Sequence, residues 1–344
     1  MPQVQLTNMK TQKPDKQVPK NVEGANGDRV LLQLYTTMLR IRRFEEKVVE
    51  LLPGSEIKCP VHLCIGQEAI AAGVCANLRN EDPVFSTHRS HGHYIAKGGE
   101  LKPLMAEIFG RETGCSKGRG GSMHLVATDV GFPGSCGIVG GAIPLAVGAA
   151  LAFAIRDQDS VAVPFLGDGA VDEGAFYESL NFAALKKLPV VFVCENNFYA
   201  THLHTRDRQP VDDIPGRARC FSMPAIQVDG NDVLSVLQTS HEAIEKARGG
   251  GGPSLIECRT YRWRGHVGLN FDLECRDKEE LERWMKHCPI AHFEEMLLKK
   301  GILSESDRER ITKDIDNEVA ASVQFARDSG FPDASELTTD VFRN

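Results

Sequence analysis

A carboxylate stands between two glycines at the point where an apolar run ends. Residues 165–174 read FLGDGAVDEG, so Asp168 follows the run SVAVPFL and is flanked by Gly167 and Gly169. A strand that ends in Gly-x-Gly and leads into a helix typically forms a turn that holds a phosphate group. Because a bare aspartate would repel a phosphate, this pattern requires a cation between the two groups.

A second polar cluster follows the next apolar run. LPVVFVCE (188–195) leads into Asn197, and a helical pattern over residues 173–187 separates the two runs. This order predicts a βαβ unit whose parallel strands end at one edge of a sheet, where Asp168 and Asn197 should meet. Their oxygens and a main-chain carbonyl from the FYA turn (198–200) make half an oxygen shell. Two diphosphate oxygens and a water would complete that shell around Mg²⁺.

Other phosphate motifs fit this stretch less well. A Rossmann fingerprint needs G-x-G-x-x-G, but the glycine after Gly169 is Gly174, which comes two positions late. No GxxxxGK[ST] occurs, which excludes a P-loop. The alternative to a magnesium site is a turn in which Asp168 and Asn197 have only a structural role and cap backbone groups. The glycine-rich GRGGSMH (118–124) is either a phosphate contact or a loop that becomes ordered on assembly.

Composition limits the class of protein. The chain has 344 residues, 42% of them apolar, and a net charge of −7, which argues against a nucleic-acid surface. The most apolar region (140–155) is interrupted by Pro144 and glycines, so it predicts a buried helix rather than a membrane span. No signal peptide is evident. Ten cysteines without a CxxC motif indicate reduced thiols, so we expect a cytoplasmic protein.

Strand and helix patterns alternate along most of the chain. This alternation predicts an α/β fold with a doubly wound parallel sheet flanked by helices. Residues 1–27 contain almost no large apolar residues and are expected to form a mobile tail, with Asp28 capping the first helix. Residues 28–344 are expected to form one domain with a C-terminal helical extension. The expected strands are 160–166, 188–195, 224–230 and 254–263, and the expected helices are 30–52, 67–78, 140–155, 173–187, 232–248 and those within 277–330.

Two segments rich in histidine and cysteine raise a metal-site alternative. HRSHGH (88–93) and CPVHLC (59–64) place potential ligands at the short spacings that transition-metal sites use. A structural zinc site usually presents four such ligands in recognisable pairs, and the chain has no CxxC. We therefore favour roles other than zinc binding for both segments.

Several motifs form one ordered series. GQEAIAAG, STHRSHGHYIAKG, GIVGGAIPLAVGAALA, the GDG and NN segments, and TYRWRGH follow one another within about residues 30–266. GDG followed after about thirty residues by NN resembles the thiamine-diphosphate binding motif. The whole series resembles the alpha subunit of the decarboxylating component of 2-oxo-acid dehydrogenase complexes, of the pyruvate and acetoin dehydrogenase type. This resemblance implies a thiamine-diphosphate-binding fold that uses thiamine diphosphate and Mg²⁺.

The resemblance also assigns residues to the cofactor. It makes Asp168 and Asn197 the metal ligands, together with the main-chain carbonyl of Tyr199. A tyrosine occupies the place of His88 in many relatives. Val139 would be an apolar prop for the bent cofactor. The residues that the resemblance places against the cofactor are His88, Arg89, Gly137, Val139, Gly167, Asp168, Gly169, Ala170, Asn197, Tyr199 and His266.

Two histidines carry the chemistry that the resemblance implies. His62 and His266 would face the reacting carbon, where a histidine can steady a substrate carboxylate or move protons. We expect His266 to lie directly after the strand at 254–263, at the same sheet edge as Asp168.

The implied function is that of half an active site. The resemblance implies a partner beta subunit that carries the pyrimidine-binding domain, in an αββα heterotetramer acting on a pyruvate-like 2-oxo acid or acetoin. After His266 the chain has no serine or proline from Val267 to Trp284, which departs from relatives that serve a lipoyl carrier. The acyl acceptor is therefore open between a lipoyl carrier protein and another molecule. A non-oxidative carboligase acting on an aldehyde or keto-sugar, and a non-catalytic regulatory subunit, are the alternative functions.

Overall fold

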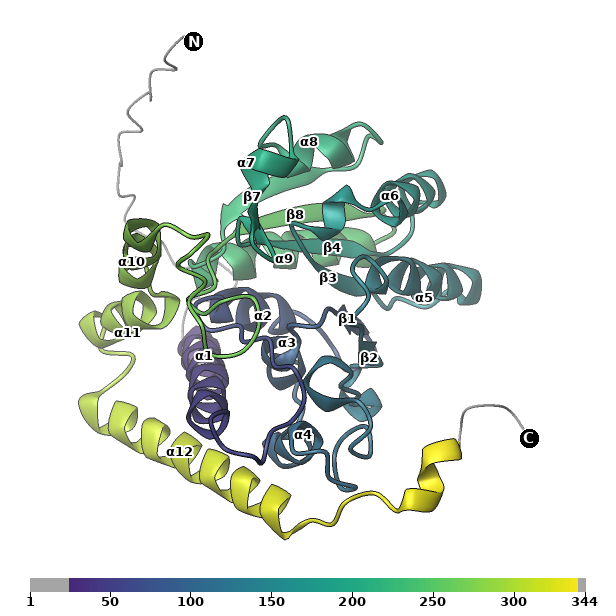
Figure 1. Ribbon diagram of the computed structural model, residues 1–344. Helices are drawn as coiled ribbons and strands as arrows, with labels where there is room; N and C mark the ends of the chain where they lie inside the picture. The colour runs from purple at the N-terminus through teal and green to yellow at the C-terminus, as the bar shows by residue number, and fades with distance from the viewer. Residues whose placement is uncertain (1–24, 340–344) are drawn as a thin grey trace.

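Six parallel strands form the sheet around which the chain is arranged. The computed structural model describes residues 25–339, and its main sheet has the strand order β2-β1-β3-β4-β8-β7 (Figure 1). Every neighbouring pair of strands runs parallel. The predicted α/β fold with a parallel sheet is therefore confirmed. The strands are β1 (Val84–Ser86), β2 (Gly134–Ser135), β3 (Val163–Gly167), β4 (Val191–Asn196), β7 (Ala225–Asp229) and β8 (Ser254–Arg259).

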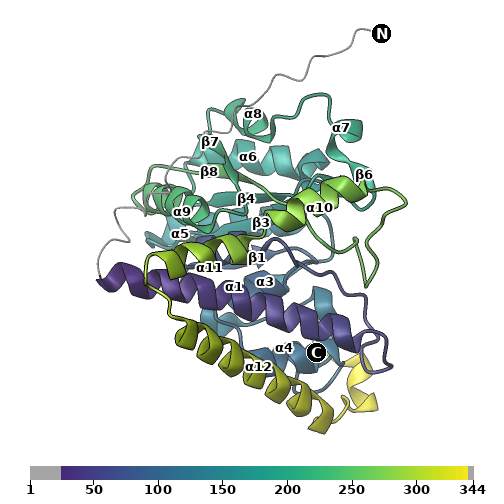
Figure 2. The ribbon, with the colours of Figure 1, turned by 90° about the vertical axis from the view of Figure 1, so that its left-hand side faces the viewer.

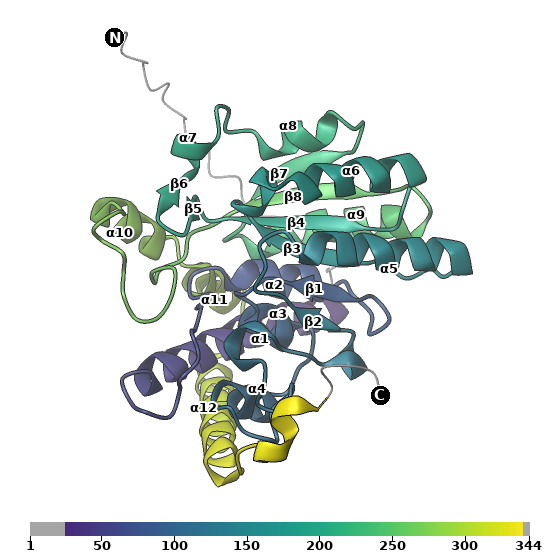
Figure 3. The ribbon, with the colours of Figure 1, turned by 45° about the vertical axis from the view of Figure 1, so that its right-hand side comes forward.

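Helices cover both faces of the sheet. Along β4, Phe192 and Cys194 face one core while Val191 and Val193 face the other, following the two-residue period of a strand. Figure 3 shows two of the helices that close the first core, α5 and α6, lying side by side. The helices of the first core are α5 (Ala142–Arg156), α6 (Gly174–Lys186) and α8 (Ile214–Arg219). The second core includes α1 (Ala25–Leu51), α2 (Glu68–Cys75), α3 (His91–Ala96) and α9 (Val233–Arg248), and it continues into the two helices α4 (Leu101–Ile108) and α12 (Glu305–Asp328).

The C-terminal helices pack on the helical layer rather than on the sheet. Helix α12 (Glu305–Asp328) lies against α4 (Leu101–Ile108) and α1, and α11 (Pro289–Lys299) lies against α1 and α2 (Figure 2). Helix α10 (Lys278–Lys286) packs its Leu281 into a small cluster with Tyr261. These are the amphipathic helices expected within residues 277–330.

The first helix begins earlier than the sequence predicts. Helix α1 starts at Ala25 and contains Asp28 in its first turn, so Asp28 is not the N-cap. An acidic residue in the first turn interacts favourably with the helix dipole, which explains why Asp28 supports the helix from within it. The expected tail therefore loses residues 25–27 to the helix, and its remaining part, residues 1–24, lies outside the described residues.

Helix α5 is buried on one face only, which corrects the expectation of a buried helix. Ile143 and Ala146 are fully buried, whereas Leu145 is 58% and Ile155 is 75% exposed. A helix that is apolar all round is expected to be covered all round. The apolar composition predicts this helix, but it does not say what covers its outer face.

Strand β8 is shorter than predicted. It ends at Arg259, four residues before the expected end at Trp263. Arg259 lies opposite the last residues of both neighbours, Asn196 of β4 and Asp229 of β7. No adjacent strand continues beyond these residues, so the ladder has no further partner and β8 must stop.

Two chemical expectations concern the whole described chain. All ten cysteines are free, as the reading of reduced thiols predicts. Between residues 25 and 339, no helix is both long enough and apolar enough to cross a membrane.

Two helical glycines give a matched test of the packing. A methyl group added at Gly73 of α2 would lie 2.8 Å from Val236 Cγ1 of α9, whereas one added at Gly148 of α5 would meet nothing within 4 Å. We expect Gly73→Ala to lower the free energy of unfolding of the chain by about 1–3 kcal/mol through overpacking. Gly148→Ala should raise it by about 0.5–1 kcal/mol, because alanine loses less backbone entropy in a helix. Denaturant unfolding of both variants checks this, and equal effects would contradict the close α2–α9 packing.

Candidate active site

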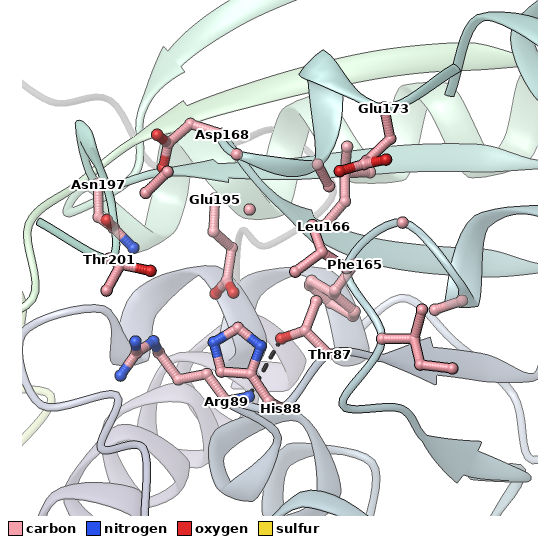
Figure 4. A pocket seen from close by; sticks show the side chains of 18 of the residues that line it. Thr87, His88, Arg89, Phe165, Leu166, Asp168, Glu173, Glu195, Asn197 and Thr201 are labelled. Carbon is pink, nitrogen blue, oxygen red and sulfur yellow. Dashed lines mark hydrogen bonds between the residues drawn. The ribbon is translucent and has the colours of Figure 1, made fainter. Parts of the chain in front are cut away.

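The register of the sheet brings the predicted metal ligands together. Gly167, the last residue of β3, pairs with Glu195 of β4, so Asp168 and Asn197 follow at the same carboxyl edge. They line a pocket of about 260 Å³. In Figure 4, Asp168 and Asn197 lie on one side of this pocket, and His88 and Arg89 lie on the opposite side. A crevice at the carboxyl ends of parallel strands is where ligands bind in open α/β sheets.

Most of the predicted cofactor contacts line this pocket. The exception is Gly137; the predicted catalytic residue His62 also lies outside the lining, with its ring against those of His88 and His266. A side chain at Gly137 would point toward His124, whose ring is 3.5 Å from that position. The predicted residues in the lining are His88, Arg89, Val139, Gly167, Asp168, Gly169, Ala170, Asn197, Tyr199 and His266.

Asp168 is buried and its charge is paired. The residue is only 2% exposed, and its carboxylate accepts hydrogen bonds from the guanidinium of Arg208 and from the Thr205 hydroxyl. Burial raises the pKa of the Asp168 carboxyl, and the charge of Arg208 opposes that rise. Arg208 also pairs with Asp172, and Gln209 donates to the main-chain carbonyl of Asp168 at 3.4 Å. The short helix α7 (Thr205–Arg208) is thus fastened to the predicted metal ligand.

The turn after β4 is shaped by two residues with left-handed backbone. Phe198 has φ 69° and Thr201 has φ 54°, values that cost energy for residues other than glycine. Between them, Tyr199 begins the two-stranded hairpin of β5 (Tyr199–Ala200) and β6 (Leu203–His204). The Thr205 amide donates to the Phe198 carbonyl at 2.7 Å, and this bond ties the turn to α7.

The two glycines beside Asp168 differ in the space that surrounds them. A methyl group at Gly169 would lie 2.9 Å from Cβ of Ala200, so the hairpin leaves no room for a side chain there. A methyl group at Gly167 would meet nothing within 4 Å, although Gly167 lines the pocket. The space over Gly167 is therefore open to a ligand that approaches the backbone closely.

Arg89 joins the two segments that carry the predicted catalytic histidines. Its guanidinium donates to the carbonyl of Leu63, next to His62, at 2.7 Å and to the carbonyl of His266 at 3.3 Å. The residue is 5% exposed. Arginine's planar fork of donors suits a position that must hold two loops and still face an anionic ligand.

Three histidines meet at one end of the pocket. The ring centroids of His62 and His88 are 4.6 Å apart, those of His62 and His266 are 5.0 Å apart, and those of His88 and His266 are 5.4 Å apart. Burial, and then the charge of Arg89, lower the pKa of His62 to about 3, of His88 to about 2 and of His266 to about 4. All three imidazoles are therefore neutral near pH 7, and each ring offers one N–H donor and one lone pair.

The other histidines of the two histidine-rich segments are held in buried networks. His91 bonds to Glu45 of α1 at 2.6 Å and to the Ser122 hydroxyl at 2.8 Å, and Glu45 also accepts from the amide of Cys64. His93 bonds to Ser86 of β1 at 2.7 Å. The ring nitrogens of His91 and His93 are thus held by partners within the fold, and these contacts fix the loops around the site.

Glu195 is a pocket residue that the sequence analysis missed. It is 5% exposed, lines the pocket and pairs with His93 at 3.2 Å, and its carboxylate points toward His88 in Figure 4. In the run LPVVFVCE the glutamate indicates only where a strand ends. Its pairing with Gly167 in the sheet, had it been predicted, would have placed Glu195 beside Asp168. Arg208 was also missed, because its pairing with Asp168 spans 40 residues and follows no local pattern.

The glycine-rich stretch 118–124 does not present its amides to a phosphate, which corrects that alternative. Glu107 of α4 is fully buried and accepts four backbone N–H groups at 2.7–3.0 Å. A carboxylate that receives several amide bonds organises a loop in the way a bound anion would. The four donors are the amides of Ser116, Gly118, Gly120 and Gly121.

The depressed pKa values predict an acid-sensitive site. Below the ordinary histidine pKa of 6.5, these three histidines become protonated in the unfolded chain but stay neutral in the folded one. The free energy of unfolding therefore decreases as the pH falls from 6.5 toward about 4. Replacing one of them, as in His88→Phe, should make this loss shallower. His241→Phe, a replacement in α9, is the control, and its stability should fall with pH as that of the wild type does. Denaturant unfolding between pH 7 and pH 5 measures the effect, and parallel curves for wild type and His88→Phe would contradict the buried neutral rings.

Known proteins match nearly the whole chain. A family profile described as the dehydrogenase E1 component covers residues 36–335. The alpha subunit of acetoin:2,6-dichlorophenolindophenol oxidoreductase from Bacillus subtilis is 46% identical over 315 residues, which cover 90% of this chain and 93% of that protein. The pyruvate dehydrogenase E1 component subunit alpha of Rhizobium meliloti is 41% identical over 311 residues, 90% of this chain and 89% of that protein. The resemblance noted in the sequence is thereby confirmed, and the chain belongs to the dehydrogenase E1 component family.

Proposed function

We propose that this chain is the alpha subunit of a thiamine-diphosphate-dependent dehydrogenase that cleaves a short 2-oxo acid or acetoin and transfers the acyl unit to an acceptor. The family depends on thiamine diphosphate. The observation that carries the proposal is the meeting of Asp168, Asn197 and Arg89 with the neutral rings of His88 and His266 in one pocket, with the His62 ring packed against both histidines. The relatives named above are oxidoreductase subunits, which favours this function over the carboligase and the non-catalytic subunit.

The donors of the pocket fit a magnesium diphosphate group. Asp168, the Asn197 amide oxygen and the Tyr199 carbonyl would hold Mg²⁺, a hard ion that prefers oxygen ligands. Arg208 already places positive charge on the Asp168 carboxylate, so that oxygen accepts a cation in this fold. Arg208 and Thr205 both bond to Oδ2 of Asp168, so Mg²⁺ would bind through the other carboxylate oxygen while Arg208 keeps its bonds to Asp168 and Asp172.

The remaining contacts follow from the lining of the pocket. The open space over Gly167 would admit the diphosphate, with the Gly169 and Ala170 backbone and Arg89 as donors. Val139, whose side chain is 50% exposed, would support the ring system of the cofactor. Gly137, which has no side chain, would contact the aminopyrimidine through its backbone. His88 would contribute a neutral donor on the side opposite Asp168.

The histidines supply acid and base groups beside the reacting atoms. When bound, thiamine diphosphate supplies the nucleophilic carbon and the electron sink for cleavage of the substrate. His266 lines the pocket, and its amide is fixed by the Asp272 carboxylate at 2.6 Å. Its neutral ring can donate a hydrogen bond to a substrate oxygen, and negative charge that develops on the bound substrate would favour protonation of the ring. His62 packs behind His266 and would orient that ring or the substrate carboxylate.

A partner subunit would complete the site. Ile138 and Val139, at the pocket, are 73% and 50% exposed, and Leu145 on the outer face of α5 is 58% exposed. Contiguous apolar residues at a pocket rim mark an interface, and a beta subunit with the pyrimidine-binding domain, in an αββα heterotetramer, would cover them. The ten free thiols support a reducing, cytoplasmic setting for this assembly.

The loop after His266 is the place where an acyl acceptor would dock. Val267 and Leu273 of this loop are 45% and 48% exposed, and Arg276 anchors the loop by bonds to the carbonyls of Arg262 and Arg264. An anchored loop with exposed apolar side chains can receive a carrier protein. We therefore infer a lipoyl carrier as the acceptor, bound through contacts that differ from those of loops built on serine and proline.

Removing the Asp168 carboxylate tests the metal assignment. Asp168→Ala should weaken binding of magnesium and thiamine diphosphate to the assembled enzyme by at least about a hundredfold, or about 2.7 kcal/mol, because the diphosphate then lacks a held cation. Asp172→Ala is the matched control, since it also removes a partner of Arg208 but does not line the pocket. Calorimetry measures both affinities. An Asp168→Ala enzyme that binds the cofactor like the wild type would show that the metal lies elsewhere.

Replacing His266 separates chemistry from structure. His266→Ala should lower turnover of the assembled enzyme by about 10²-fold or more while thiamine-diphosphate affinity stays close to that of the wild type. His202→Ala removes an exposed imidazole that faces the same Asp272 and should leave turnover nearly unchanged. Steady-state kinetics and cofactor titration provide the two readouts. A modest, parallel decline in both for His266→Ala would make His266 a loop anchor only.

A further inference from the structure

The three-histidine cluster has the composition of a transition-metal site. One ring nitrogen from each of His62, His88 and His266 lies within 4.8 Å of the other two. The segments CPVHLC and HRSHGH each contribute one histidine, and the loop after β8 contributes the third. The sequence analysis favours roles other than zinc binding for both segments, because neither presents a complete ligand set. The structure instead brings one histidine from each segment together with His266, an arrangement that no local pattern shows.

The ring nitrogens of the cluster are free to bind a ligand. Within residues 25–339, none of the three rings makes a hydrogen bond, and Nδ1 of His62 is buried without any partner. A buried polar atom without a partner loses its interaction with water and gains nothing in return. The three neutral imidazoles therefore hold lone pairs that no group of the described chain uses.

We propose that His62, His88 and His266 bind one divalent transition-metal ion of the zinc class, with the fourth ligand position open to the pocket. Three protein ligands with one open position are the arrangement of exchangeable and catalytic zinc sites, whereas structural sites have four protein ligands. Imidazole suits Zn²⁺, Co²⁺, Ni²⁺ and Cu²⁺, whereas Mg²⁺ prefers oxygen donors. This site is therefore chemically distinct from the one at Asp168.

Geometry and charge make the site exchangeable. Zinc–nitrogen bonds of about 2.0–2.1 Å require the three nitrogens to close to about 3.3 Å from one another, which side-chain rotation can supply. The charge of Arg89 opposes a dication, and the carboxylate of Glu195, which points toward His88 in Figure 4, offsets that charge. A site whose ligands are already close together, but whose metal ion is repelled by a nearby arginine, is expected to bind metal reversibly.

Metal at this cluster would inhibit the enzyme. An ion bound to His62 and His266 takes the lone pairs that acid–base catalysis needs, and it fills the space beside the reacting atoms. This consequence rests on the proposed function, whereas metal binding itself does not. Zinc-class ions and the substrate would thus compete for the same histidines.

Cobalt spectroscopy on the metal-free full-length chain tests the site directly. One equivalent of Co²⁺ should produce the visible absorption bands of four- or five-coordinate cobalt, and Zn²⁺ should abolish them while Mg²⁺ does not. His88→Phe should weaken this binding by about a hundredfold or more, since even the loss of an outer-shell partner typically costs 10–100-fold. His241→Ala, which removes a histidine of α9, should bind cobalt like the wild type.

Two results would overturn the proposal. A near-ultraviolet thiolate-to-cobalt band would show that cysteine holds the ion, because exposed Cys220 and Cys275 are the competing ligands. Cobalt binding that is equal in His88→Phe and wild type would place the ion away from the cluster. Thermal unfolding confirms that His88→Phe is folded, and His62→Phe provides a second variant that removes a ligand from another segment.

An activity measurement separates this proposal from the proposed function. With partner subunit, excess Mg²⁺ and saturating thiamine diphosphate, Zn²⁺ should inhibit turnover, and a nitrogen-donor chelator that leaves Mg²⁺ free should restore it. Cobalt bands without any 2-oxo-acid or acetoin turnover would support the metal site and reject the proposed function. Turnover that Zn²⁺ leaves unchanged at concentrations that fill the cobalt site would overturn the inhibitory role.

Discussion

A buried carboxylate at the carboxyl edge of the sheet is the constraint on which the site depends. Asp168 is 2% exposed, and an unpaired ionised carboxylate at that depth would cost several kcal/mol. The fold meets this requirement with a cation, because the Arg208 guanidinium reaches Asp168 from α7. Because Arg208 and Thr205 both bond to Oδ2 of Asp168, the charge and orientation of the predicted metal ligand depend on the segment that carries them. Through Thr205 the same segment is tied to the turn at Phe198.

The opposite wall of the pocket is fixed by contacts that span the chain. Arg89 bonds the carbonyls of Leu63 and His266, which lie 26 and 177 residues away from it. Behind it, Glu45 of α1 holds both His91 and the Cys64 amide. Helix α1 thus supports the loop of His62 although it touches no ligand. Such buried, satisfied networks favour one arrangement of the loops that meet at the pocket.

The sequence predicts the parts of the site that follow from strand order. Asp168 and Asn197 could be placed together, because parallel strands joined by a crossover must end at one edge. The end of β8 could not be predicted, since it depends on where two other strands stop. Arg208 could not be predicted either, because its partner is fixed by the fold and not by spacing. Only the family resemblance placed His62 and His266 at one site, and the contact of both with His88 was not predicted, since no local pattern relates the three segments.

The pocket separates two kinds of donor within one cavity. Oxygen atoms of Asp168 and Asn197 lie on one side, and nitrogen atoms of the histidine cluster lie on the other. A hard ion such as Mg²⁺ binds imidazole weakly and prefers oxygen ligands, whereas a zinc-class ion binds imidazole well. Ligand type, rather than affinity alone, can therefore direct each ion to its own side. Since Glu195 lies between the two sides and points toward His88, its charge also favours a cation at the histidines. The neutral rings that can donate hydrogen bonds to a bound substrate near pH 7 also carry the lone pairs that bind a metal.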